Sequence, residues 1–179
     1  AAGEGTVIVS GTPTFVSTIG NTYRPAQLTI NGATTFQAAV QTTLLTTTAA
    51  ISNGTTLNVS GNSSIGANVT TSSTQTYTDA VTLTANTTLA GSTVTNSSTV
   101  AGGGFSLAIT GNSSIGGAIT SVSNFSVSGT TGLGANVSTT GTQTYTGAVT
   151  VNSADRTLTT TSTTAGDTIV FGSTVDSDG

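Results

Sequence analysis

Residues 57–82 read LNVSGNSSIGANVTTSSTQTYTDAVT, and residues 125–150 read FSVSGTTGLGANVSTTGTQTYTGAVT. The two segments align without a gap, and 16 of their 26 positions are identical. A shorter copy, LAITGNSSIGGAIT, begins at Leu107, and more diverged copies begin at Val7 (VIVSGTPTFVSTI) and Leu28 (LTINGATTFQAAV). Such internal repetition is typical of repeat architectures, in which each unit buries its apolar face against the next unit.

All five copies share one spacing of apolar residues. In the copy at Phe125, a second apolar residue, Val127, follows two positions later, then Gly129, then Leu133 and Val137. Side chains two residues apart lie on the same face of a strand, and Gly permits a tight corner. No helical periodicity is present, and Thr, Ser, Val and Gly are poor helix formers. The spacing therefore predicts short strands joined by corners.

The repeat units are expected to stack along the whole chain. Weaker copies without the Gly begin at Val81, Val149 and Ile169. The unit starts then fall near residues 7, 28, 57, 81, 107, 125, 149 and 169, at spacings of 18–29 residues. We expect an all-β fold, a single β-solenoid domain over residues 1–179 with about eight rungs, whose corner loops vary in length. A rise of ~4.8 Å per rung gives a length of roughly 40 Å.

The apolar skeleton and the aromatic residues predict the interior of the solenoid. The predicted core residues are Val9, Phe15, Ile30, Phe36, Val59, Ile65, Val69, Tyr77, Phe105, Ile109, Ile115, Phe125, Val127, Leu133, Val137 and Tyr145. Phe15 and Phe36 are 21 residues apart, and Phe105, Phe125 and Tyr145 follow at steps of 20, so ladders of rings are expected. The alternative to core filling is a carbohydrate-stacking role for Tyr77 or Tyr145.

The composition excludes several classes of function. Only 4% of the residues are charged, and Arg24 and Arg156 are the only cations. Nucleic-acid binding and attraction to an anionic membrane both need clusters of Lys or Arg, so neither partner is expected. No apolar run approaches the ~20 residues of a membrane-spanning helix, so no membrane insertion is expected either.

Chemistry is also restricted by the residue types. With no His and no Cys, neither a Ser-His-Asp triad nor a thiolate nucleophile can form. A paired-carboxylate glycosidase is the remaining enzymatic alternative. The acids are Glu4, Asp79, Asp155, Asp167, Asp176 and Asp178. Because they lie mainly at unit junctions and near the C-terminus, we expect a non-enzymatic protein without a cofactor.

Two segments, TGTQTYTGAVTV (140–151) and DTIVFGSTVDSDG (167–179), resemble the β-strand repeats of filamentous-haemagglutinin-like exoproteins, large adhesins of Gram-negative bacteria. The resemblance extends through roughly residues 57–179. It implies a right-handed parallel β-helix, export to the cell surface, and a role in adhesion or biofilms. No counterpart of that family's N-terminal secretion domain is evident, so the segment would be stalk.

A second resemblance competes with the first. VSGNSSIGANV (59–69) and ITGNSSIGGAI (109–119) are similar to repeats of phage tail fibres and other trimeric spikes. In those proteins three chains wrap together and each contributes part of every layer. Both resemblances imply an elongated β fibre, and they differ in whether one chain or three form the core.

Four smaller motifs have alternative interpretations. Asp176-Ser177-Asp178-Gly179 is similar to the start of a calcium loop, although a solvated turn is the favoured interpretation. Asp155-Arg156 is expected to be a corner, either with a local ion pair or without one. The Thr-rich arrays 74–78 and 142–146 are similar to the faces of ice-binding solenoids, although ordinary solvent-facing strand positions also explain them. Nine Asn residues lie in N-x-[ST] sequons, which are either coincidental, part of side-chain ladders, or glycosylated. They are Asn53, Asn58, Asn62, Asn68, Asn86, Asn96, Asn112, Asn124 and Asn136.

The sequence therefore favours a structural or adhesive segment of a secreted cell-surface fibre, with a host or cell-surface glycan or protein as receptor. A self-assembling extracellular filament subunit and a trimeric fibre segment are the alternatives, followed by an ice- or glycan-binding solenoid. The first unit starts by Val7 and the last runs almost to Gly179, and neither end resembles a polar cap. Uncovered solenoid ends recruit other strands. We expect either a piece of a longer solenoid or contacts between copies, end to end or side by side.

Overall fold

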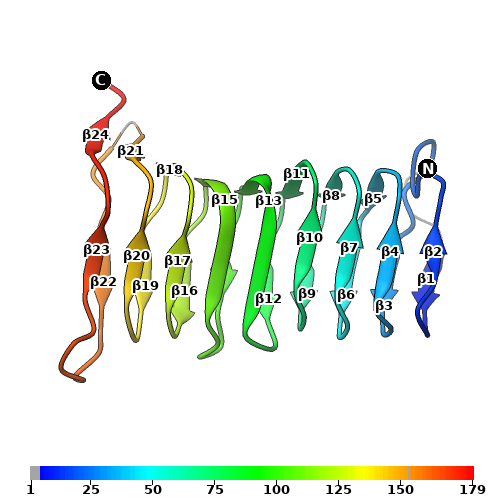
Figure 1. Cartoon of the computed structure of the whole chain (residues 1–179), viewed down its shortest axis with the longest axis horizontal. Helices are drawn as coiled ribbons and strands as arrows, with labels where there is room; N and C mark the ends of the chain where they lie inside the picture. Colours follow the sequence, from blue (N-terminus) through cyan, green and yellow to red (C-terminus); the bar gives the residue numbers. More distant parts are fainter. Residues whose placement is uncertain (1–4, 153) are drawn as a thin grey trace.

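The chain forms one β-solenoid of nine stacked rungs, in which each strand pairs in parallel with the strands of the neighbouring rungs (Figure 1). This computed structural model describes residues 5–152 and 154–179. Those residues form strands, turns and bends and contain no helix, so none of them belongs to a helix able to cross a membrane. The prediction of an all-β solenoid is confirmed, with nine rungs where about eight were expected.

The first face is a nine-stranded sheet with one strand from each rung. Its strands are β1 (Thr6–Val9), β3 (Gln27–Ile30), β6 (Leu44–Thr47), β9 (Ser63–Ile65), β12 (Val81–Leu83), β14 (Val100–Ala101), β16 (Ile119–Val122), β19 (Val137–Thr139) and β22 (Leu158–Thr160). Consecutive strands begin 17 residues apart at the closest, from Gln27 to Leu44, and 21 apart at the most, as from Thr6 to Gln27.

The second and third faces together form a fifteen-stranded sheet. The second face contains β2 (Thr14–Phe15), β4 (Thr34–Phe36), β7 (Ile51–Asn53), β10 (Val69–Thr71), β17 (Phe125–Val127), β20 (Gln143–Tyr145) and β23 (Ile169–Phe171). The third face contains β5 (Val40–Thr42), β8 (Leu57–Val59), β11 (Thr74–Tyr77), β18 (Thr131–Leu133), β21 (Val149–Val151) and β24 (Val175–Ser177). The longer strands β13 (Thr87–Asn96) and β15 (Leu107–Ile115) run through the corner and belong to both faces. Each rung is thus closed by a single chain.

The alternation of the sequence decides which side chains enter the interior. In three-residue strands such as β8 and β17 the outer two residues are buried and the middle residue is half-buried. Apolar residues therefore point inward, and Thr, Ser or Asn points outward. Corner glycines let successive rungs approach. At Gly111, whose φ is 117°, a Cβ atom would lie 1.8 Å from the Gly91 carbonyl oxygen of the rung before.

Fourteen of the sixteen predicted core residues are buried, and the other two, Phe15 and Phe105, are half-buried and pack against the core. The buried fourteen are Val9, Ile30, Phe36, Val59, Ile65, Val69, Tyr77, Ile109, Ile115, Phe125, Val127, Leu133, Val137 and Tyr145. Phe15 stacks on Phe36 with ring centroids 5.2 Å apart, and Tyr145 makes an edge contact with Phe125 at 5.9 Å. Tyr77 and Tyr145 are 0% exposed, so the carbohydrate-stacking alternative is wrong.

Phe105 does not join the expected ladder with Phe125. In the register of the sheet, Phe125 lies beside Leu107. Phe105 lies in the corner before β15, which is extended by Gly103 and Gly104, both at positive φ. A spacing of 20 residues therefore does not bring Phe105 beside Phe125. The corner that contains Phe105 is longer, so the residue in register with Phe125 is Leu107.

Several predicted unit starts lie on different faces. Val7, Leu28 and Val81 are on the first face, Leu57 and Val149 on the third, and Leu107, Phe125 and Ile169 on the second. The pattern of two apolar residues followed by a corner occurs on every face. Copies aligned by sequence are therefore strand-and-corner units, and they do not mark whole rungs.

Polar side chains share the interior with the apolar ones. Thr42, Thr71 and Thr139 point inward at the ends of strands, and each hydroxyl donates to the carbonyl oxygen two residues later, at 2.6–2.9 Å. A buried hydroxyl without such a partner would cost free energy. These Thr residues therefore bind the inward-turned corner carbonyls, a role that the apolar skeleton of the sequence did not indicate.

Candidate functional surfaces

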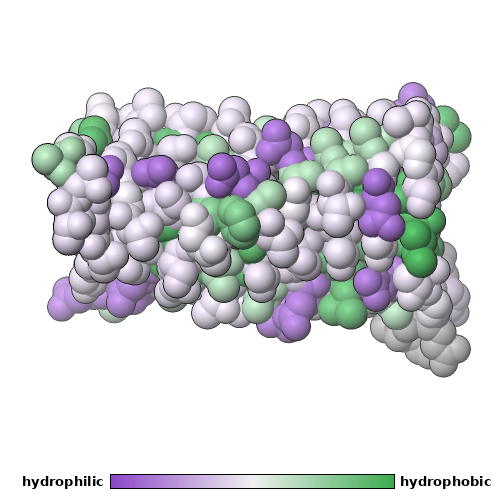
Figure 2. All heavy atoms as spheres, turned by 90° about the horizontal axis from the view of Figure 1, so that it is seen from below, coloured by the Kyte–Doolittle hydropathy of each residue, from purple (hydrophilic) through white to green (hydrophobic). Residues whose placement is uncertain are grey.

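The lateral surface carries columns of small side chains in register, and most of them are polar. On the first face the outward column runs through Thr29, Thr46, Ser64, Thr82, Ala101 and Thr120. On the third face it runs through Asn58, Thr76, Thr95, Ser114, Gly132 and Thr150. Between residues 25 and 152 the only charged residue is Asp79. Figure 2 shows the result on one side, a mostly pale surface of intermediate hydropathy along the length of the molecule.

The two Thr-rich arrays do not form one surface. Array 74–78 lies on the third face, whereas array 142–146 lies on the second face. Thr74 and Thr76 align with Thr93 and Thr95 of the next rung, but the rung after that continues with an Asn and a Ser. The pairs of Thr are therefore in register on two rungs only, which favours ordinary solvent-facing positions over an extended ice-binding face.

Seven of the nine sequon Asn residues fall into two groups, and the other two, Asn58 and Asn62, are half-buried and exposed respectively. Asn53 and Asn96 are buried, and their side-chain amides donate to nearby backbone carbonyls, so they are closed to glycosylation. Five exposed Asn residues use Oδ1 to accept a backbone N–H of the following rung at 2.8–3.0 Å. These are Asn68, Asn86, Asn112, Asn124 and Asn136. These bonds add hydrogen bonds between rungs at the corners, and they join each Asn side chain to the backbone of the next rung and not to a neighbouring Asn side chain.

The acidic residues near the C-terminus are spread over the last rung. Asp176 lies in the extended strand β24, and Asp178 continues it with its N–H 3.2 Å from the Val151 carbonyl, so the expected solvated turn is wrong. Pairing with β21 keeps this segment extended. In the corner before β22, Arg156 Nη2 donates to the Asn152 carbonyl at 2.9 Å. Within residues 5–152 and 154–179, no three acidic, His or Cys side chains gather as metal ligands.

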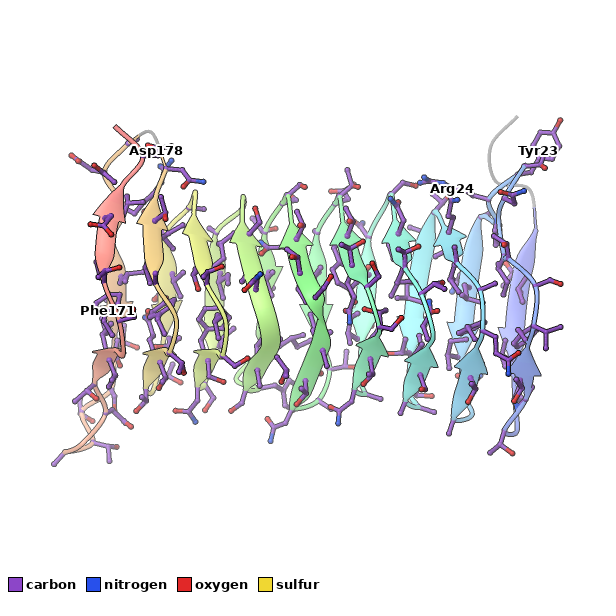
Figure 3. All side chains as sticks on the ribbon, turned by 45° about the horizontal axis from the view of Figure 1, so that its top comes forward. Tyr23, Arg24, Phe171 and Asp178 are labelled. Carbon is purple, nitrogen blue, oxygen red and sulfur yellow. The ribbon has the colours of Figure 1, made fainter. Side chains whose placement is uncertain are left out.

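Most of the exposed large hydrophobic side chains belong to the first and last rungs. Seven large hydrophobic residues of the described chain are exposed, and six of them belong to the first or the last rung. They are Ile8, Val16 and Tyr23 in the first rung and Val170, Phe171 and Val175 in the last, the seventh being Leu44. Figure 3 shows Tyr23 at one end and Phe171 and Asp178 at the other, with Arg24 set back from the first rung.

No protein-family model matches the chain, and comparisons with curated proteins and with solved structures find no match.

Proposed function

We propose that the chain is a non-enzymatic structural and adhesive segment of a secreted cell-surface fibre. The observation that carries this proposal is the continuity of the core columns, which run from β1 to β22 on the first face and on through every rung of the other two. A stack of this kind is effectively one-dimensional and rigid along its axis. Its function is to hold a fixed length and to present small side chains, most of them with hydroxyl groups, along its faces.

Adhesion in this proposal is multivalent. The outward columns carry hydroxyl groups on most rungs, and neighbouring rungs are ~4.8 Å apart, so a receptor with repeating polar groups can contact several rungs together. Each contact is weak, but several contacts made together give strong binding. A glycan or a protein on a host or cell surface is the expected receptor.

Electron microscopy and a binding array test the two halves of the proposal. The purified protein should appear as straight rods, and beads coated with it should bind some glycans or cell-surface proteins with a steep dependence on coating density. Two matched variants locate the adhesive face. One carries Thr46→Lys, Thr82→Lys and Thr120→Lys on the first face, and the other carries Thr76→Lys, Thr95→Lys and Thr150→Lys on the third.

We expect one of these variants to lose binding while both keep the rod shape, because outward substitutions leave the core intact. Compact particles in place of rods contradict the structural half. Beads that bind nothing on the array contradict the adhesive half.

A self-assembling extracellular filament is the second candidate. It is favoured by the confinement of exposed large hydrophobic residues to the first and last rungs, with the exception of Leu44. The closure of each rung by a single chain favours a one-chain core over a trimeric fibre.

A further inference from the structure

Two Asn-Gly pairs occur in the sequence, Asn31-Gly32 and Asn53-Gly54. Asn is a chemically labile residue in proteins, and a following Gly has no side chain to shield its backbone nitrogen from attack or from attacking. The first pair directly follows β3, and the second begins at the last residue of β7. Both pairs therefore lie where a strand passes into a corner, and their surroundings can be compared.

The reacting atoms of the Asn31-Gly32 pair are free. The Asn31 side chain is exposed, and its Oδ1 accepts the Thr48 hydroxyl at 3.2 Å. Its Nδ2 has no hydrogen-bond partner among the described residues, and neither has the backbone N–H of Gly32. In a cyclisation of this pair, Nδ2 is the group that leaves and the Gly32 nitrogen is the group that attacks. Neither atom has to give up a bond of the fold.

The reacting atoms of the Asn53-Gly54 pair are held. Asn53 is 3% exposed, its Nδ2 donates to the Thr56 carbonyl at 2.9 Å, and its Oδ1 accepts the N–H of Thr55 at 2.9 Å. The Gly54 N–H donates to the Phe36 carbonyl of the rung before at 2.7 Å. Cyclisation here requires a local opening that breaks these bonds, so its rate is reduced to the small fraction of molecules that are open.

The packing of the rungs requires a glycine at position 32. A Cβ atom there would lie 1.7 Å from the Gly11 carbonyl oxygen of the rung before. Any side chain would overlap that oxygen, so the residue after Asn31 has to be Gly for these two rungs to stack. The same close approach therefore keeps the backbone nitrogen beside Asn31 unshielded.

We propose that Asn31 is a site of spontaneous deamidation, which adds a negative charge to the lateral surface as the protein ages. The Gly32 nitrogen gives its proton to water and attacks Cγ of Asn31. A C–N bond forms, the bond from Cγ to Nδ2 breaks, and Nδ2 takes up a proton and leaves as ammonia. Water then opens the succinimide ring, at the side-chain carbonyl to give Asp or at the backbone carbonyl to give isoaspartate. The new carboxyl group releases its proton to water.

The carboxylate of the Asp product is compatible with the corner. Its oxygen can accept the Thr48 hydroxyl as the amide oxygen does, and hydrogen bonds to a charged acceptor are the stronger ones. Between residues 25 and 152 the only charged residue of the parent chain is Asp79, so the reaction doubles the number of charges on this stretch. The inference goes beyond the fibre function proposed above and does not depend on it.

Peptide mapping by mass spectrometry tests the site, because deamidation exchanges an –NH2 group for –OH and changes the mass of one peptide. The folded protein is kept in mildly alkaline buffer and sampled over time. We expect Asn31 to deamidate at least about tenfold faster than Asn53, since only Asn53 needs a local opening. In guanidinium chloride neither pair is held by the fold, and the two rates should become similar.

Three results overturn the proposal. They are an Asn31 that stays intact in the folded protein, an Asn53 that reacts as fast as Asn31 there, and a difference of the same size in guanidinium chloride. The last result would assign the contrast to the neighbouring sequence and not to the fold.

Two variants locate the new charge by isoelectric focusing. Asn31→Gln keeps an amide on a longer side chain that closes the corresponding larger ring more slowly, so we expect its acidic form to accumulate much more slowly than that of the parent. Asn31→Asp carries the charge from the start and should focus with the aged parent. An aged Asn31→Gln variant that gains the acidic form at the parent's rate places the reaction at another residue and contradicts the proposal.

Discussion

The segments 57–82 and 125–150 are nearly the same sequence on different faces of the solenoid. Gln75 and Tyr77 lie on the third face in β11, whereas their counterparts Gln143 and Tyr145 lie on the second face in β20. The hydrogen bonds are nevertheless alike. Each tyrosine hydroxyl donates to the Oε1 of its glutamine, at 2.9 Å in the first copy and 3.0 Å in the second.

The glutamine amides also bind equivalent backbone atoms. Gln75 Nε2 donates to the Val69 carbonyl at 2.9 Å and to the Ala90 carbonyl of the next rung at 2.7 Å. Gln143 Nε2 donates to the Val137 carbonyl at 3.3 Å and to the Thr159 carbonyl of the next rung at 2.8 Å. The structural unit is therefore one strand with its corner. This unit forms the same hydrogen bonds on the second face as on the third.

A buried charge should lower the free energy of unfolding to the same extent in both copies. Val69 and Val137 are equivalent in the two segments, 0% exposed, and on the second and first faces respectively. Val69→Asp and Val137→Asp should each cost more than about 4 kcal/mol, because neither carboxylate meets a partner in the apolar core. The outward neighbours supply the controls, and Thr70→Asp and Ser138→Asp should change the unfolding free energy by less than about 1 kcal/mol. Urea unfolding measures all four, and an unchanged midpoint for either Val variant would show that its side chain does not face the core.

Removing one glutamine tests whether the two polar networks are energetically equal. Gln75→Leu and Gln143→Leu should each cost about 3 kcal/mol, since the tyrosine hydroxyl and the backbone carbonyls lose a buried partner. The double variant Gln75→Leu/Tyr77→Phe should recover part of that loss because it removes the stranded hydroxyl. Chemical unfolding of the single and double variants gives the coupling energy. A clearly smaller loss of unfolding free energy in one copy would show that the strength of the network depends on the face on which it lies.

Substitution by Ala at one pair of equivalent positions should affect the stability of the two copies differently. Gly147 occupies the position equivalent to Asp79, and a Cβ atom on Gly147 would lie 2.4 Å from the Gly129 carbonyl oxygen of the rung before. Gly147→Ala should therefore cost about 2 kcal/mol through local overpacking. Asp79→Ala, at an exposed position, should stay within about 0.5 kcal/mol of the parent. Thermal melting compares the two, and equal losses would contradict the close approach at Gly147.

Alkaline pH should weaken both copies gently. Burial raises the pKa of the Tyr77 and Tyr145 hydroxyls above the ordinary tyrosine range. The folded pKa is then higher than the unfolded value, so this stability is fully present below about pH 10 and is lost as the pH rises further, by about 1.4 kcal/mol per pH unit for each tyrosine. Unfolding by urea between about pH 9 and pH 11 measures the slope. The Tyr77→Phe/Tyr145→Phe variant should lose this slope, and an unchanged slope would assign it to other groups.

The fold was predictable because two apolar residues separated by one position, followed by a corner, leave few alternatives to a stacked β architecture. The number of rungs was harder to predict from the sequence than the fold class. Leu57 and Phe125 begin equivalent sequences but lie on different faces, so alignment of the copies does not give the period of a turn. The inward Gln75 and Gln143 were also missed, because a glutamine flanked by Thr has the pattern of a solvent-facing strand, and its partners become evident only when rungs stack.

The interior was more predictable than the lateral faces. The apolar skeleton of the repeats assigned Val59 and Val127 to the core, and both are 0% exposed. The lateral surface has no dense cluster of charges or aromatic residues in the sequence, and its columns emerge only from the register between strands. Sequence therefore indicates which residues fill the interior better than it indicates what the sides bind.

The indifference of the strand-and-corner unit to its face has an evolutionary consequence. First buried positions recur every six residues through Leu57, Ser63, Val69, Gln75 and Val81. An in-frame duplication of one such unit by replication slippage keeps the interior continuous while it turns every later rung by one face, so all downstream outward columns are reshuffled. A duplication of three units lengthens the rod by one rung and leaves those columns in place. The gene can thus change its length and its surface by separate copying errors, both of which leave the protein foldable.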